Sequence, residues 1–240
     1  MIRNLEWLNG VKTSFIISEI YMQLNTAFER SEASILQTNK VIKNTYILLS
    51  MTLVFSAFTA FIGVATGASF GMALGANILA IVLLWFVLPK TANSSLGIPT
   101  IFAFTGLLGF GLGPLLSHYL AVNPSIVMTA MGGTGAIFLA LSGYALTTRK
   151  DFSFMGGFLM VGIFVVIGAS LLNIFLGIPA LALAVSAGVI LVMSGFILYE
   201  TSALINGGES NYIMATASLF LSILNIFTAL LHILGVFSDD

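Results

Sequence analysis

The sequence is dominated by long apolar stretches that short breaks with turn-forming or charged residues separate. Seven stretches can be delimited, from Tyr46 to Thr66, Ser69 to Leu88, Ile98 to Leu120, Ser125 to Leu146, Phe154 to Leu176, Ala180 to Leu204 and Tyr212 to Phe237. A helix needs about 20 mainly apolar residues to cross the hydrocarbon core of a bilayer. Only 7% of the residues are charged, whereas a soluble domain carries about 25%. The sequence therefore predicts an all-α membrane protein, with a tail at residues 1–44 and a bundle of seven transmembrane helices at residues 45–240.

The basic residues predict how this bundle is oriented. If the N-terminus lies in the cytoplasm, the alternation of seven helices places all eight Lys and Arg residues on the cytoplasmic side. They are Arg3, Lys12, Arg30, Lys40, Lys43, Lys90, Arg149 and Lys150. Basic residues favour the cytoplasmic side during insertion. We therefore expect a cytoplasmic N-terminus and a periplasmic C-terminus, which ends in Asp239-Asp240.

Several classes of function lack the residues that they need. The chain has no cysteine, which excludes thiol catalysis and cysteine-based metal sites. It has no HExxH motif and no GxSxG elbow, which hydrolases of these classes need. It also has no lysine inside an apolar stretch, which a retinal-type receptor needs to form its Schiff base. A net charge of −1 gives no reason to expect a nucleic-acid partner. The sequence therefore predicts a protein that is not an enzyme and that needs no cofactor and no metal.

One carboxylate lies within a predicted span. Glu200 follows Tyr199 near the cytoplasmic end of the sixth stretch. A carboxylate at that depth is costly unless it faces the bundle interior, is paired or is neutralised. Glu200 is therefore either a group that senses protons or cations, or a carboxylate that reaches the aqueous interface or hydrogen-bonds to neighbouring helices. The sequence leaves both alternatives open.

The remaining polar residues of the spans favour structural roles. His118 and His232 are isolated histidines near the outer ends of two spans, without a carboxylate close in sequence, so they do not indicate a metal site. Asn173, Ser222 and Asn225 lie within spans, where we expect them to form hydrogen bonds between helices.

Glycine and proline positions predict how the helices pack and bend. Gly63-Gly67, Gly71-Gly75 and Gly109-Gly113 have four-residue spacing, which places small residues on one helix face and allows helices to approach closely. Pro114, within the third stretch, lacks a backbone donor and predicts a kink.

Several short strings resemble the Bax-inhibitor-type membrane family, also called the transmembrane Bax inhibitor motif family, over roughly Thr38 to Gly235. The strings are Asn44-Thr45-Tyr46, Phe104-Thr105-Gly106, Gly113-Pro114, Leu146-Thr147-Thr148-Arg149-Lys150-Asp151, Tyr199-Glu200-Thr201 and Asn225-Ile226-Phe227. Three further strings are similar to the bacterial members that modulate the protease FtsH: KTAN (Lys90 to Asn93), LTTRKD, and GGE-x-NYI (Gly207 to Ile213).

This resemblance implies a location and a partner. It implies a multi-pass protein of the bacterial inner membrane that binds FtsH and restrains its proteolysis of other membrane proteins. A processive protease engages an unstructured end, so the N-terminal tail before Thr38 is the candidate partner-binding segment. The lipid bilayer is the other expected partner.

The resemblance also implies a second function, a pH-sensitive calcium or proton leak. Some family members resemble channels closed by a pair of aspartates on spans six and seven. The corresponding positions of this chain are Glu200 and Ser222, which are therefore the candidate pH- or ion-sensing residues. Two carboxylates that share a proton can act as a pH switch. Because Ser222 supplies no second carboxylate, the sequence favours the protease modulator and keeps the leak as the alternative.

Overall fold

The computed structural model describes residues 36–238. Nearly all of the N-terminal tail that the sequence indicates as a protease handle therefore lies outside the described residues. Two units are distinguished along the chain, Met1–Lys40 and Val41–Asp240, and the helical bundle belongs to the second.

The described residues contain seven helices that are long and apolar enough to cross a membrane, which confirms the predicted fold class. Their bounds are Leu36–Ala65, Phe70–Thr91, Gly97–Val122, Pro124–Thr148, Ser153–Leu176, Pro179–Ile205 and Tyr212–Ser238. The first helix includes described residues before Tyr46, so the helical segment extends beyond the predicted span on its N-terminal side. Within the other spans, the elements are α2 (Phe70–Val82), the π-helical turn η1 (Leu83–Val87), α3 (Leu88–Thr91), α4 (Gly97–Gly111), α5 (Gly113–Val122), α6 (Pro124–Thr148), the 3-10 turn η2 (Ser153–Met155), α7 (Gly156–Leu176), α8 (Pro179–Ile205) and α9 (Tyr212–Ser238).

Proline explains the interruptions in the second and third spans. Pro89 cannot donate a hydrogen bond to the preceding helical turn, and the chain adopts the π-helical turn η1 just before it. Pro114 lies at the start of α5, and the third span is divided there into α4 and α5 at Leu112. The predicted kink at Pro114 is confirmed.

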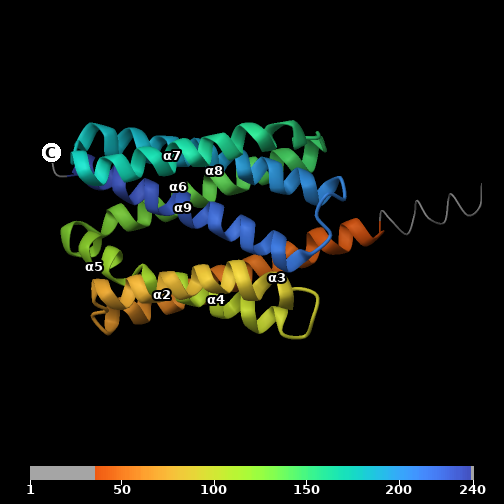
Figure 1. The fold of residues 1–240 in the computed structure, drawn as a ribbon, viewed down its shortest axis with the longest axis horizontal. Coiled ribbons are helices and arrows are strands. Elements are labelled where there is room, and N and C mark those ends of the chain that lie inside the picture. The colour runs from red at the N-terminus through yellow and green to blue at the C-terminus, as the bar shows by residue number, and fades with distance from the viewer. Residues whose placement is uncertain (1–35, 239–240) are drawn as a thin grey trace, which may run out of the picture. The chain divides into compact units, whose positions relative to one another are not determined.

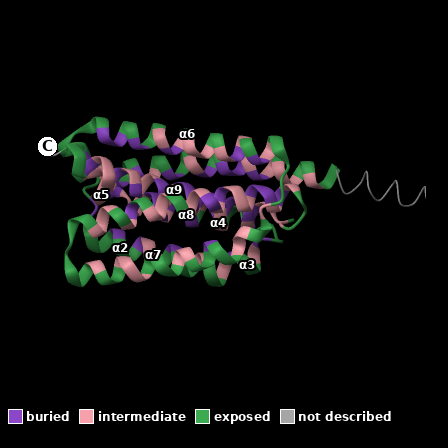
Figure 2. Ribbon diagram, turned by 90° about the horizontal axis from the view of Figure 1, so that it is seen from above, coloured by how far each residue is buried: buried purple, intermediate pink, exposed green. Residues whose placement is uncertain are grey.

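Helix α9 forms the centre of the bundle and packs against α8, α6 and α4 (Figure 1). Phe220 of α9 is completely buried, and its ring meets that of Phe104 of α4 edge to face at 6.1 Å. Helix α7 lies at the periphery of the bundle instead. It packs on α8, and Leu159 is its one buried residue. Figure 2 shows buried positions along α9 and α4, whereas exposed positions line the outer helices. The apolar side chains of α7 therefore face the region that lipid occupies.

Glycines allow the first helix to cross the third span at very short range. A Cβ atom on Gly63 would lie 2.8 Å from the carbonyl oxygen of Phe110, and one on Gly113 would lie 2.8 Å from the carbonyl carbon of Gly63. A Cβ on Gly109 would meet the carbonyl oxygen of Ser56. The spacing of Gly109 and Gly113 therefore serves close helix packing, as predicted, whereas Gly71 and Gly75 meet no other helix closely.

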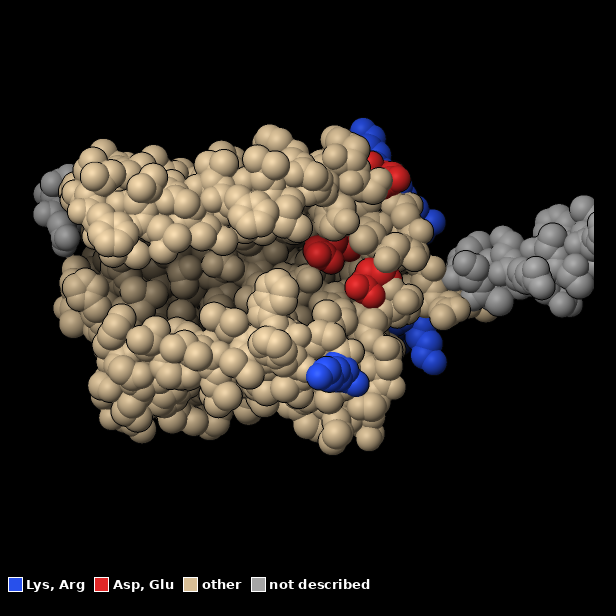
Figure 3. Space-filling model, viewed as in Figure 1, with Lys and Arg blue, Asp and Glu red and all other residues tan. Residues whose placement is uncertain are grey.

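The basic side chains of the bundle gather at one end. Within residues 41–238 they are Lys43 in the first helix, Lys90 in α3, and Arg149 and Lys150 after α6. Figure 3 shows Lys and Arg atoms at the end of the bundle where α8 leads into α9, and none at the opposite end of that face. This asymmetry is what the predicted orientation requires, although the side of the membrane that each end faces remains a prediction.

Reporter fusions test this orientation. We expect fusions after Lys150 and Gly208 to be active as cytoplasmic reporters, because these residues lie in loops at the basic end of the bundle. Fusions after Asn123 and Asp240 should be active only as periplasmic reporters. A cytoplasmic signal from the Asp240 fusion would contradict the orientation.

Candidate functional site

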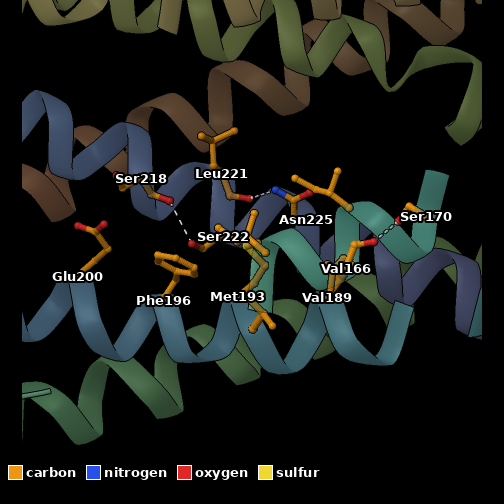
Figure 4. Close-up of a pocket in the computed structure, with 13 residues that line it drawn as sticks. Val166, Ser170, Val189, Met193, Phe196, Glu200, Ser218, Leu221, Ser222 and Asn225 are labelled. Carbon is orange, nitrogen blue, oxygen red and sulfur yellow. Dashed lines mark hydrogen bonds between the residues drawn. The ribbon is translucent and has the colours of Figure 1, made fainter. Parts of the chain in front are cut away.

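The two site residues predicted from the sequence line one cavity between α7, α8 and α9. The cavity has a volume of about 460 Å³ and is mostly apolar (Figure 4). Its lining consists of Ile163, Val166, Ile167, Ser170, Val189, Val192, Met193, Phe196, Glu200, Ser218, Leu221, Ser222 and Asn225. Helix α8 packs against both α7 and α9, whereas no extended contact joins α7 to α9 in the described part of the chain. The cavity is therefore a slot between α7 and α9 with α8 as its shared wall.

Glu200 lies at one end of the slot and Ser222 lies along its side (Figure 4). The side chain of Glu200 is half-buried, and the hydroxyl of Ser218 in α9 lies within its reach. Ser222 is one helical turn beyond Ser218 and is only 4% exposed. Glu200 therefore lines the slot, with its carboxylate near a hydroxyl of the neighbouring helix α9.

A second carboxylate acts on Glu200, and it comes from a loop. Glu209 belongs to the connection between α8 and α9 and lies within electrostatic range of Glu200. Its Oε1 atom accepts a hydrogen bond from the backbone N–H of Asn211 at 2.6 Å, which fixes the side chain near the start of α9. No sequence pattern links Glu209 to Glu200, because Glu209 lies in a loop outside the apolar spans.

The prediction that Asn173, Ser222 and Asn225 form hydrogen bonds between helices is wrong. Ser222 Oγ donates to the carbonyl of Ser218 at 3.1 Å, and Asn225 Nδ2 donates to that of Leu221 at 2.8 Å. Asn173 Oδ1 accepts from the N–H of Ile178, just after its own helix. Short polar side chains satisfy themselves on nearby backbone groups at low entropic cost.

The family-like strings, which are distant in sequence, meet in space instead. Tyr46 Oη lies 3.2 Å from Thr201 Oγ1, which joins the first helix to the residue after Glu200. Asn211 Nδ2 donates to Asn93 Oδ1 at 2.8 Å, which joins GGE-x-NYI to KTAN. No sequence pattern predicts these pairings, because at least one transmembrane span separates the two members of each pair along the chain.

Ser202 joins the charged loop after α6 to helix α8. Its buried hydroxyl accepts from the N–H of Phe152 at 2.9 Å and donates to the carbonyl of Lys150 at 3.2 Å. Arg149 ends α6 in the left-handed conformation, with φ of 51°. The string LTTRKD thus ends in a loop whose backbone is fixed to α8. No sequence pattern marks Ser202, apart from its position next to Thr201.

The loop also fixes one carboxylate outside the spans. Asp151 Oδ1 accepts from the N–H of Ser153 at 2.8 Å, and hydrogen bonds from the Ser153 backbone and side chain lower the pKa of Asp151 below its usual range. The ionised form is favoured in the folded state, so its stabilising effect is present above the ordinary pKa of an aspartate, about 3.9. This effect is lost as the pH falls through the lowered pKa.

Both histidines have a partner within the bundle. His232 Nδ1 lies 3.0 Å from Ser186 Oγ of α8, and the ring of His118 meets that of Tyr119 at 5.2 Å. Among residues 36–238, no group of three or more His, Cys, Asp or Glu side chains is arranged to hold a metal ion. The slot itself combines an apolar body with carboxylates near one end, an arrangement that can attract a positively charged group.

Comparison with known proteins assigns the chain to a family. The family model described as "Inhibitor of apoptosis-promoting Bax1" matches residues 38–239. A protein of Escherichia coli K12, "Modulator of FtsH protease YccA", is 52% identical over 86% of this chain and 94% of its own length. An "Uncharacterized membrane protein" of Vibrio cholerae is 51% identical over 85% of this chain and 93% of its own length. An E. coli O6:H1 relative, also 52% identical, is named "Inner membrane protein YccA". The chain is therefore a multi-pass inner-membrane protein that belongs to the Bax inhibitor family.

Proposed function

We propose that this protein binds the protease FtsH in the inner membrane and restrains its proteolysis of other membrane proteins. The observation that carries the proposal is the 52% identity to the E. coli modulator of FtsH, which extends over 94% of that protein. An alignment of this length covers most of this chain, so the similarity is not confined to one part of the bundle.

The bundle has properties that suit a protein held by a protease but resistant to it. Half of the residues in an 18-residue apolar stretch of α9 are buried inside the bundle, and α9 packs on three other helices. Extracting α9 would expose this core, whereas a polar terminal tail is easily engaged. We propose that the tail before Thr38 is the segment that FtsH engages and that the packed bundle then resists extraction.

Crosslinking in native membranes tests the partner. We expect the tagged full-length protein to capture FtsH after crosslinking. Deleting the residues before Thr38 should weaken this capture and lengthen the lifetime of the protein, because the proposed handle is lost. A matched control replaces the tail with an unrelated polar segment of equal length. Capture and turnover that do not change upon deletion would remove the tail from the mechanism.

The slot between α7, α8 and α9 supports a second candidate function, the pH-sensitive leak. The supporting observation is that Glu209 places a second carboxylate within electrostatic range of Glu200. A leak predicts calcium or proton flux through wild-type protein in vesicles, which Glu200→Gln should alter while it preserves side-chain shape. The modulator predicts no flux above that of empty vesicles. A pH-gated flux that Glu200→Gln abolishes would favour the leak.

A further inference from the structure

We propose that the slot between α7, α8 and α9 receives a transmembrane helix of the partner protein, with a Lys or Arg at that helix's cytoplasmic end placed beside Glu200 and Glu209. This inference rests on the proposed function, since it assigns a docking surface for a membrane-embedded partner. It names the chemistry of the docking segment, an apolar helix with a basic cytoplasmic end.

The geometry of the slot fits a helix. Helices pack with their axes about 8–10 Å apart, and α7 and α9 both pack on α8 without extended contact to each other in the described part of the chain. Side chains of all three helices line the slot, so a helix that lies along its opening would contact each of them. Helix α7, with Leu159 as its one buried residue, has most of its surface free for such a contact.

The side chains of α9 that face the slot favour close helix approach. Ser218, Ser222 and Asn225 lie on one face of α9, at spacings of four and three residues (Figure 4). The Ser222 hydroxyl and one of the two N–H groups of the Asn225 amide already donate to their own helix. Small polar side chains of this kind are typical of interfaces between transmembrane helices.

Charge complementarity selects a protein helix as the occupant. Glu200 lies at the end of the slot, Glu209 lies within electrostatic range of it, and Figure 3 shows acidic atoms at one end of a hollow on this face of the bundle. This is the end at which the basic residues gather, which the predicted orientation places in the cytoplasm. Transmembrane helices of other proteins carry Lys and Arg preferentially at that same end. A docked parallel or antiparallel helix would therefore bring its basic end to the two carboxylates.

Single cysteines test the docking surface directly, because the chain has no cysteine of its own. We expect Ile163→Cys in α7 and Val189→Cys in α8, both lining the slot, to crosslink to FtsH when each full-length variant is co-reconstituted with it and labelled with a cysteine-reactive photocrosslinker. The control is Val165→Cys, which lies in α7 outside the slot and is 63% exposed. The slot positions should give at least about ten times the crosslinking yield of the control, because contact falls off steeply beyond the interface.

Charge reversal tests the acidic end. Glu209→Lys should weaken FtsH binding about tenfold, since it replaces attraction with repulsion at a partly exposed site. Glu209→Gln, which keeps a hydrogen-bond acceptor for the N–H of Asn211, should have a smaller effect. Thr148→Lys adds one positive charge at the same end, which is the same change in charge as in Glu209→Gln, at an exposed position outside the slot, and should bind as wild type does.

The outcomes separate this inference from the proposed function. If the wild type binds FtsH but all three cysteines crosslink equally and Glu209→Lys binds normally, the docking surface is wrong and the modulator proposal stands. Crosslinks from the slot to phospholipid alone, with or without FtsH, would also overturn the inference, because they identify a lipid as the occupant. If the wild type does not bind FtsH, the proposed function fails and this inference fails with it.

Discussion

Replacing Gly113 by alanine is expected to destabilise the bundle by about 3 kcal/mol and to lower the midpoint of thermal unfolding in detergent by roughly 10 °C. A Cβ atom at this position would lie 2.8 Å from the carbonyl carbon and 2.9 Å from the Cα of Gly63. These are backbone atoms, so no side chain can rotate away to make room. Alanine before Pro114 is also disfavoured in a helical conformation, which adds strain.

The matched control is Gly75→Ala in α2. A Cβ atom there meets nothing within 4 Å, and alanine is a better helix former than glycine by about 1 kcal/mol. We expect this variant to be at least as stable as the wild type. Equal unfolding midpoints for Gly113→Ala and Gly75→Ala would show that the first helix and the third span do not cross where the structure places them.

Ser202→Ala is expected to release the loop that carries Arg149 and Lys150. The substitution leaves the N–H of Phe152 without the acceptor that the Ser202 hydroxyl provides at 2.9 Å, and the carbonyl of Lys150 loses its donor. Each lost hydrogen bond at this partly buried site costs about 1 kcal/mol. Trypsin cleavage after Arg149 and Lys150 in the solubilised protein should therefore accelerate about tenfold, because cleavage follows the population of the open loop.

Ser50→Ala provides the comparison for this loop. Ser50 is exposed, and its hydroxyl donates only to the carbonyl of Tyr46 in its own helix at 2.8 Å. Its replacement should leave trypsin cleavage unchanged. If Ser202→Ala is cleaved at the wild-type rate, then the hydrogen bonds of Ser202 do not hold the loop.

The number of helices could be predicted from the sequence, whereas their packing could not. Hydropathy reports how long an apolar run is, but nearly every side chain in these spans is apolar, so it does not separate the face toward the core from the face toward lipid. Phe220 is completely buried and Phe164 is 68% exposed, although both lie in the middle of an apolar span. Kinks were predictable where proline removes a donor, as at Pro114.

The candidate site was predictable only in part. Glu200 was identified because a carboxylate in an apolar span is rare, and Ser222 because the family resemblance pairs it with Glu200. The slot itself depends on how far apart α7 and α9 lie, which no local pattern encodes. Glu209 was missed because it reaches Glu200 only through the fold of the loop that joins α8 to α9.

The rate at which purified FtsH degrades a membrane-protein substrate in vesicles, with and without this protein, is the most direct measurement of the central claim. The proposed function predicts that the rate falls as the ratio of this protein to FtsH rises. It also predicts that degradation of a soluble FtsH substrate in the same vesicles is much less affected, because the bundle competes within the membrane. A membrane-substrate rate that stays constant at every ratio, with the protein folded and correctly inserted, would contradict the account.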